Sequence, residues 1–195
     1  AELKSQTARE AAMKLHGKLK SLGKKIEDIK KIKIRTHEAA IRIIDKKGAL
    51  NNPADRDHCI QYMIAVPLIY GRLTAADYED NIALDPQIDA LRDKMECVED
   101  PQFTRDYFDP EKRSIANALT VTLNDGTVLD EVVVEYPIGH KRRREEGIPE
   151  LMKKFKINLA RKFPDKQQLA ILDASMEFDV LAKMPVNEFV DLMVI

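Results

Sequence analysis

Apolar residues recur every three or four positions through the first 22 residues of the chain. This spacing places side chains on one face of an α-helix, and Gly23 follows at a position where helices commonly end. The pattern therefore predicts a first helix that ends near residue 23. The stripe consists of Leu3, Thr7, Ala11, Leu15, Leu19 and Leu22.

The pattern then changes to one that is typical of β-strands. In IEDIKKIKIRTH, Ile32 and Ile34 alternate with charged residues, which predicts a strand with one solvated face. The segment ECVED is a second candidate strand. The strongest local signal is ANALTVTLNDGTVLDEVVVEYP, in which two β-rich arms flank Asn124, Asp125 and Gly126 and predict a hairpin.

Capping residues predict several short helices between these strands. His37 precedes a helix that we expect to end near Gly48, and Asp55 is the expected N-cap of a helix that runs through Tyr62 to Tyr70. The further expected features are a kink at Pro67, a cap at Thr74, and a helix opened by Asp85 and Pro86.

Strands and helices mix up to residue 147, whereas residues 148–195 predict helices only. We therefore expect an α+β fold, with a small antiparallel sheet and flanking helices in residues 1–147 and an all-helical segment in residues 148–195. The apolar residues of this segment exceed what a small sheet can cover. We expect them to pack on a part of the protein that precedes Ala1, and such surfaces also allow a homo-oligomer.

Composition excludes several classes of protein. The 32 Lys and Arg residues nearly balance the 33 Asp and Glu residues, which argues against a nucleic-acid partner. No apolar run approaches the roughly 20 residues that span a membrane. Cys59 and Cys97 lack metal-ligand spacing, so we expect no metal and a reducing, cytoplasmic location. The chain has no GxGxxG, P-loop, HExxH or GxSxG motif, and we expect no cofactor.

Ionisable residues crowd ahead of the apolar run in NNPADRDHCIQYMIAVPLIYG. His58 and Tyr62 are four residues apart and would share a helix face near a helix N-terminus, where they could form an acid/base pair beside a carboxylate ligand. The alternative is structural. In that interpretation Asp55 and Asp57 cap the helix, Arg56 pairs with one of them, and His58 and Tyr62 are partly buried and hydrogen-bonded.

A second cluster of charges lies in GHKRRREEGIP. Its basic run is short and lacks interleaved aromatic residues, so it is a weak nucleic-acid site. Arg142, Arg143 and Arg144 either bind a carboxylate through their guanidinium forks or belong to an ordinary solvated loop. Lys4 is a further candidate, although a lysine beside a helix is usually solvated.

Several long blocks resemble the C-terminal part of the MmgE/PrpD family. These blocks are IRTHEAAIRIIDKKGALNNPADRDHCIQYMIAVPLIYGRLTAADYED, FTRDYFDPEKRSIANA, VVVEYPIGHKRRREEGIPELMKKFKINLAR and MPVNEFVDL. The resemblance implies a two-part enzyme, in which an α+β lid is inserted before the last helices of a large helical domain. It also implies cofactor-free elimination of water from 2-methylcitrate, a small tricarboxylate of propionate breakdown.

The same resemblance implies roles for particular residues. Tyr62 matches a lid-side tyrosine that reaches the active site, with His58 as a neighbour. From charge type alone, Arg56 and the arginines of residues 142–144 are candidates to bind substrate carboxylates. Where the family pattern reads AEFHSQTAVEAA this chain reads AELKSQTAREAA, so Lys4 replaces a histidine and joins the candidates for substrate binding.

Most family catalytic residues would belong to the missing N-terminal helical domain. We therefore expect the chain alone to be inactive. The alternative is a non-catalytic module that binds anionic metabolites or a protein partner.

Overall fold

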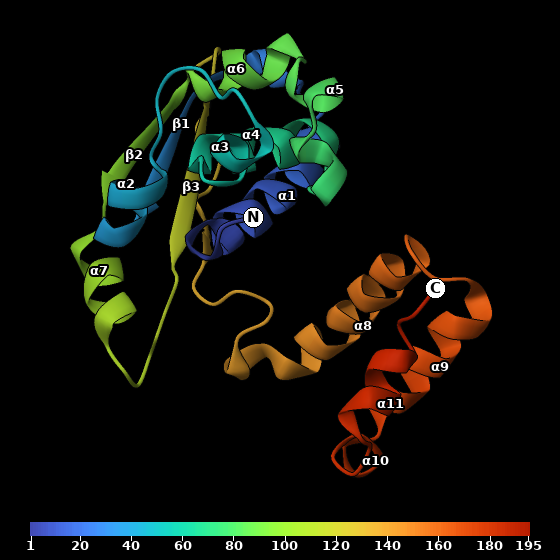
Figure 1. Ribbon diagram of the computed structural model, residues 1–195. Coiled ribbons are helices and arrows are strands. Elements are labelled where there is room, and N and C mark those ends of the chain that lie inside the picture. Colours follow the sequence, from blue (N-terminus) through green and yellow to red (C-terminus); the bar gives the residue numbers. More distant parts are fainter. The chain divides into compact units, whose positions relative to one another are not determined.

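The computed structural model describes residues 1–195 and divides into two compact units. The N-terminal unit comprises Ala1–Pro137 and the C-terminal unit comprises Ile138–Ile195 (Figure 1). The sequence-based boundary after residue 147 falls within a helix of the C-terminal unit. Each unit is described by itself.

The N-terminal unit combines one sheet with helices and short 3-10 helices, labelled η. In chain order its elements are η1 (Leu3–Ser5), α1 (Gln6–Ser21), η2 (Ile26–Asp28), β1 (Ile29–Thr36), α2 (Glu38–Ile44), α3 (Pro53–Asp57), α4 (Ile60–Tyr70), η3 (Ala75–Tyr78), α5 (Asp80–Ala83), α6 (Pro86–Arg92), β2 (Met95–Glu99), α7 (Pro101–Phe108), β3 (Asn117–Leu123) and β4 (Val132–Val134). The α+β class predicted from the sequence is confirmed.

The four strands form one sheet in the order β2-β1-β3-β4. Strand β1 is antiparallel to β3 and β3 is antiparallel to β4, but β1 is parallel to β2. Two of the three strand pairs are therefore antiparallel as predicted, and the parallel pairing of β1 with β2 was not predicted. The chain leaves β1 at Thr36 and returns through helices α2 to α6, so that β2 enters the sheet at Met95 in the same direction as β1.

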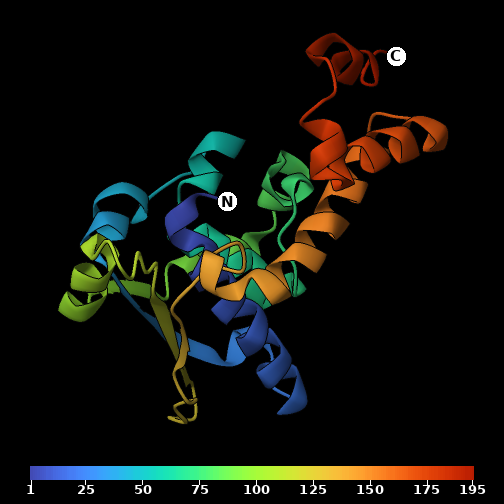
Figure 2. The same cartoon turned by 90° about the horizontal axis from the view of Figure 1, so that it is seen from below.

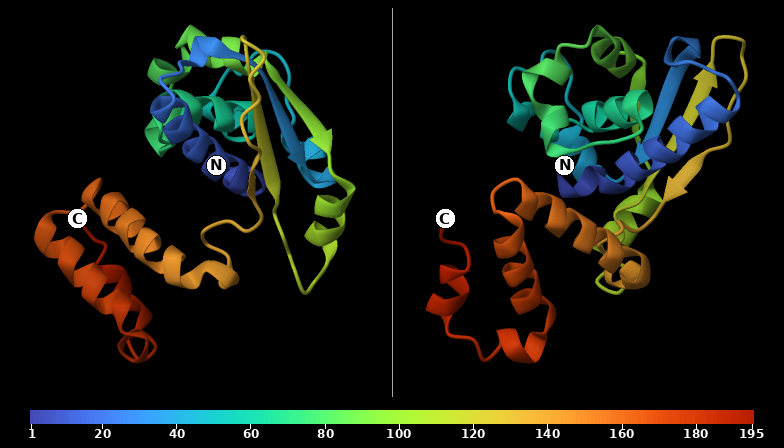
Figure 3. Two further views of the ribbon diagram at one scale, coloured as in Figure 1. Left: turned by 180° about the vertical axis from the view of Figure 1, so that it is seen from behind. Right: turned by 90° about the vertical axis from the view of Figure 1, so that its right-hand side faces the viewer.

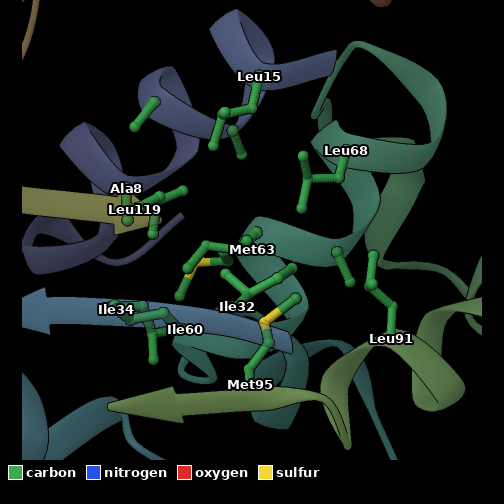
Figure 4. Packing of buried hydrophobic residues seen from close by; sticks show 14 of the residues in the cluster. Ala8, Leu15, Ile32, Ile34, Ile60, Met63, Leu68, Leu91, Met95 and Leu119 are labelled. Carbon is green, nitrogen blue, oxygen red and sulfur yellow. The ribbon is translucent and has the colours of Figure 1, made fainter. Parts of the chain in front are cut away.

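The core lies between one face of the sheet and the helices α1 and α4, which cover that face (Figures 1 and 3). Ile32 and Ile34 of β1 face Met63 of α4, as Figure 4 shows. The opposite face of β1 carries exposed lysines, including Lys31 and Lys33. The alternation of isoleucine and lysine therefore orients the strand, since successive side chains point to opposite faces.

Most of the predicted helix caps are confirmed. The Ala40 N–H donates a 3.3 Å hydrogen bond to His37 Nδ1 at the start of α2, and Thr74 precedes η3 as predicted. The prediction for Asp55 is wrong, because Asn52 caps α3 and Pro53 occupies its first position. Helix α2 also ends at Ile44, earlier than expected.

The predicted hairpin is present, with a short second arm. Gly126 adopts φ 87°, a left-handed conformation that glycine tolerates and that the tight turn requires. Only Val132–Val134 pair regularly as β4, although Thr122 and Val128 form an isolated bridge nearer the turn. The turn is the yellow loop at the bottom of Figure 2.

The C-terminal unit is helical. Its elements are η4 (Lys141–Arg143), α8 (Arg144–Ala160), α9 (Asp165–Met176), α10 (Phe178–Leu181) and α11 (Val186–Asp191). Helices α8 and α9 lie side by side (Figure 3) and bury a small cluster around Leu159, Ile171 and Leu172. In the whole chain, none of the helices has both the length and the apolar character needed to cross a lipid bilayer.

Candidate functional site

Polar residues from three separate segments meet where β1 ends and β3 begins, beneath η1. We call this group the sheet-end cluster. It consists of Glu2, Lys4, Thr36, His37 and Asn117. Strand β1 delivers Thr36 and His37, strand β3 begins with Asn117, and the turn η1 brings Glu2 and Lys4 over them.

Lys4 is held against the protein and is not a solvated lysine. Its side chain is 14% exposed, and Lys4 Nζ lies 2.8 Å from Glu2 Oε1. The other oxygen of the Glu2 carboxylate accepts a 2.7 Å hydrogen bond from the Lys4 backbone N–H. The Glu2 N–H in turn donates a 3.2 Å bond to the carbonyl of Asp57, which connects this region with α3.

His37 lies fully buried beside Lys4. Burial, the nearby charge of Lys4 and the opposing effect of Glu2 together lower the pKa of His37 to about 4. Its ring stacks on Tyr107 with centroids 4.3 Å apart. Since Nδ1 accepts from the Ala40 N–H, the neutral ring carries its proton on Nε2.

The predicted pair of His58 and Tyr62 does not form. Helix α3 ends at Asp57 and α4 begins at Ile60, so the two residues do not share a helix face and that prediction is wrong. Tyr62 is 1% exposed, and its hydroxyl donates a 2.6 Å bond to the carbonyl of Asp77. Burial raises the pKa of this phenol to about 12. The structure therefore places Tyr62 in the core of the unit.

His58 lies at the surface, at the end of α3. Its side chain is 47% exposed, and Nδ1 lies 2.5 Å from Asp57 Oδ1 and 3.2 Å from the carbonyl of Ala54. When Nδ1 carries the proton and donates to Asp57, Nε2 is left as a proton acceptor. The Asp57 and His58 pair is thus a candidate for acid/base chemistry at the surface of the N-terminal unit.

Arg56 is buried and bound to two protein groups. Its Nη1 donates a 2.6 Å bond to the carbonyl of Tyr78, and its Nη2 lies 2.7 Å from Asp80. The prediction that Arg56 pairs with Asp55 or Asp57 is wrong, because the side chain turns toward η3 and α5. These contacts fix α3 to the following segment and leave Arg56 poorly placed to bind a ligand.

The three arginines of the basic segment lie in the C-terminal unit. Arg142 and Arg143 belong to η4 and Arg144 begins α8, so the predicted loop is partly helical. Arg143 pairs with Glu146 at 2.8 Å. His140 caps η4 by accepting a 3.2 Å bond from the Arg142 N–H. Their role toward a substrate stays a prediction.

Comparison with known proteins identifies the family. The sequence model of the MmgE/PrpD C-terminal domain matches residues 1–178. The chain belongs to the MmgE/PrpD family. Its relatives include the 2-methylcitrate dehydratases of Cupriavidus necator and Escherichia coli K12, with 70% and 66% identity over 98% and 100% of this chain. The mitochondrial 2-methylcitrate dehydratase of Yarrowia lipolytica is 61% identical over 100% of the chain.

The chain spans about two fifths of the length of these MmgE/PrpD relatives. It covers 40% of the Cupriavidus and Escherichia proteins and 37% of the Yarrowia protein. The structure therefore describes the part of the family architecture that its C-terminal domain represents. No group of three or more His, Cys, Asp or Glu side chains within it is arranged to hold a metal ion.

Sequence reasoning missed most of the sheet-end cluster. Glu2, Thr36 and Asn117 were assigned no role from the sequence, and the default role expected of His37 was to cap a helix. The one available signal was local: a threonine and a histidine directly follow the apolar positions of β1. A polar pair at the buried end of a strand is typical of a site or of a capped turn, and here His37 caps α2.

Proposed function

We propose that this chain is the C-terminal part of an enzyme that eliminates water from 2-methylcitrate to give 2-methyl-cis-aconitate, without a cofactor. The observation that carries the proposal is the 61–70% identity to proteins named 2-methylcitrate dehydratase over 98–100% of the chain. The match to the family's C-terminal domain supports it as well.

The reaction breaks a C–H bond next to a carboxylate and the C–O bond of the neighbouring hydroxyl. A base takes the proton, a double bond forms, and the hydroxyl leaves with a proton as water. Cations near the carboxylate stabilise the negative charge that develops on it. The groups needed are therefore an acid/base group and several cations.

In this proposal His58 is the acid/base group that the N-terminal unit contributes. Asp57 holds its Nδ1, and the exposed imidazole can exchange a proton at Nε2. Lys4 binds a substrate carboxylate. Arg142, Arg143 and Arg144 are candidates for carboxylate binding by the C-terminal unit. Tyr62 and Arg56 have structural roles, because both are buried and hydrogen-bonded within the unit.

The remaining catalytic groups would come from an N-terminal helical domain, which we propose as the partner of the C-terminal helices. These helices expose large apolar side chains that such a domain would cover. The exposed residues include Leu151, Ile157, Leu169, Met176, Phe178, Val180, Val186 and Val190. A homo-oligomer would be a second way to cover them. The proposal places the protein in the cytoplasm, as its sequence suggests.

The test compares the complete protein with the 195-residue chain in an assay for 2-methyl-cis-aconitate. We expect turnover of 2-methylcitrate by the complete protein and none by the chain alone. A chain that matches the complete protein in rate would disprove the need for a second domain. A complete protein that binds citrate but does not dehydrate 2-methylcitrate would favour the alternative, a module that binds anionic metabolites.

A further inference from the structure

Three buried polar atoms of the sheet-end cluster have no hydrogen-bond partner within the protein. They are Thr36 Oγ1, His37 Nε2 and Asn117 Oδ1. All three residues are at most 1% exposed. Buried polar atoms are almost always hydrogen-bonded, and those that lack a protein partner commonly bind an ordered water or another ligand.

Two of these residues are neighbours across the sheet. The antiparallel register pairs Arg35 with Ala118, and its continuation by one residue places Thr36 opposite Asn117. Directly opposite residues of an antiparallel pair point to the same face. This face is the helix-covered one, because the Asn117 amide donates a 2.7 Å bond to Thr7 of α1.

The hydrogen bonds already present determine whether each of the three atoms can donate or accept a further hydrogen bond. Asn117 Nδ2 donates to the Lys4 carbonyl at 2.8 Å and to Thr7 Oγ1 at 2.7 Å, so Oδ1 is an acceptor. His37 Nε2 carries the ring proton and is a donor, because Nδ1 accepts from the Ala40 N–H. The Thr36 hydroxyl can rotate to donate.

Lys4 lies near two of the three residues. Its carbonyl accepts from Asn117, and its charge acts on His37, so the backbone and side chain of one residue lie near both. Thr36 precedes His37 in the chain. Thr36 thus lies opposite Asn117 in the sheet and next to His37 in the chain, and the ion pair of Lys4 and Glu2 acts on His37.

We propose that this end of the sheet binds one hydroxyl-type oxygen, which accepts hydrogen bonds from His37 and Thr36 and donates one to Asn117. An enclosed water has this combination of bonds, and so does the alcohol group of a hydroxy acid. The ligand is neutral at this atom, and Lys4 would bind an adjacent carboxylate if the source is a hydroxy acid. The assignment of the oxygen to a hydroxy acid rests on the proposed function, whereas its assignment to an enclosed water does not.

The first experiment replaces Thr36 by valine, which has the same shape and lacks the hydroxyl. If the hydroxyl has no partner, its removal relieves an unsatisfied group and raises the denaturation midpoint of the 195-residue chain. If it binds an oxygen ligand, its removal lowers the midpoint, and this is the result we expect. Thr122→Val, a half-buried position on β3, is the matched control with a smaller expected change. A raised or unchanged midpoint for Thr36→Val would exclude an enclosed water, and together with equal affinities for the two tricarboxylates in the second experiment it would overturn the proposal.

The second experiment identifies the source of the oxygen. Citrate and tricarballylate differ only in the hydroxyl, so their affinities for the complete protein are measured by calorimetry for the wild type and Thr36→Val. A wild-type preference for citrate on the order of tenfold or more, lost in the variant, assigns the site to a hydroxy acid. Equal affinities, with water in the site in a crystal structure of the protein, assign it to water.

An empty site in that crystal structure, together with equal affinities, would overturn the inference. Neither measurement requires turnover. The proposed function fails if the complete protein does not dehydrate 2-methylcitrate, and this result is independent of the midpoint of Thr36→Val. The two failures can therefore be distinguished.

Discussion

The hydroxyl of Tyr62 donates a 2.6 Å hydrogen bond to the backbone carbonyl of Asp77, and this bond joins the middle of α4 to η3 inside the N-terminal unit. The ring of Tyr62 also stacks near that of Tyr78, with centroids 5.9 Å apart. The phenol thus has a complete environment without any ligand. The main contribution of Tyr62 is therefore to the stability of the N-terminal unit.

We expect Tyr62→Phe to destabilise the 195-residue chain by about 1–3 kcal/mol, because the carbonyl of Asp77 would lose its buried donor. Chemical denaturation of the two chains measures this difference. Tyr70→Phe is the control: its hydroxyl bonds Asp85 at a half-buried position where water can replace it, so a smaller loss is expected. If stability were unchanged and the complete protein lost most of its turnover, Tyr62 would instead have a role in catalysis.

Gly71 ends α4 in the left-handed conformation, with φ 68°. A Cβ at this position would lie 3.0 Å from ring atoms of His16, whose Nδ1 lies 2.8 Å from the carbonyl of Leu68. We expect Gly71→Ala to cost about 1–2 kcal/mol or more, from the backbone conformation and the close contact together. Thermal or chemical denaturation gives the difference.

Gly17 provides the opposite case in the same pair of helices. It lies at an exposed position inside α1, and a Cβ there would meet no atom within 4 Å. Gly17→Ala should stabilise the chain by about 0.5–1 kcal/mol, because alanine loses less backbone entropy in a helix. If Gly71→Ala did not destabilise the chain, the proposed contact between Gly71 and His16 would be wrong.

The features predicted correctly from the sequence depend on residues close together in the chain. Strand β1 follows from the alternation of isoleucine and lysine, and the β3–β4 hairpin follows from Asn124, Asp125 and Gly126, whose turn chemistry is local. The parallel pairing of β1 with β2 could not be predicted in this way. It depends on where the chain returns after six intervening helical segments.

The break between α3 and α4 was missed for a related reason. No glycine or proline separates Asp57 from Ile60, so the segment reads as one helix. In the structure, Cys59 takes an extended conformation before α4 and the two helices have different surroundings. Tertiary packing thus overrides local helix preference. The sheet-end cluster could not be found either, since its members are up to 115 positions apart and carry no shared motif.

Acid should destabilise the protein through His37. The imidazole is neutral when buried, and its pKa is lowered to about 4 from an ordinary value of about 6.5. The unfolded chain therefore binds a proton that the folded chain does not. Stability is fully present above pH 6.5 and falls as the pH decreases toward 4, by up to about 3 kcal/mol.

The check is the free energy of unfolding between pH 4 and pH 7. His37→Asn removes the titrating group while asparagine can still cap α2, so its stability should change less over this range. The charged groups that act on His37 are Lys4 and Glu2, and the variant retains both. Equal slopes for wild type and variant would show that His37 does not control this pH dependence.

The last prediction concerns the charge of Lys4. Lys4→Met keeps the length of the side chain and the backbone bond from Asn117, but it removes the ammonium group. Because a hydrogen bond to a charged group contributes about 1.5–3 kcal/mol, we expect kcat/KM of the complete protein for 2-methylcitrate to fall roughly 10- to 150-fold. Lys4→Arg should retain part of the activity, since it keeps the positive charge.

A matched control separates this effect from general loss of charge. Lys14 is 54% exposed on α1 and pairs with Glu10 at 3.0 Å, so Lys14→Met removes a more exposed ion pair on the same stretch of chain, away from the sheet-end cluster. We expect it to leave kcat/KM unchanged, because exposed pairs contribute little. If Lys4→Met also had no effect while its denaturation midpoint stayed at the wild-type value, Lys4 would not bind substrate. Its pairing with Glu2 would then serve only to fold η1 over the end of the sheet.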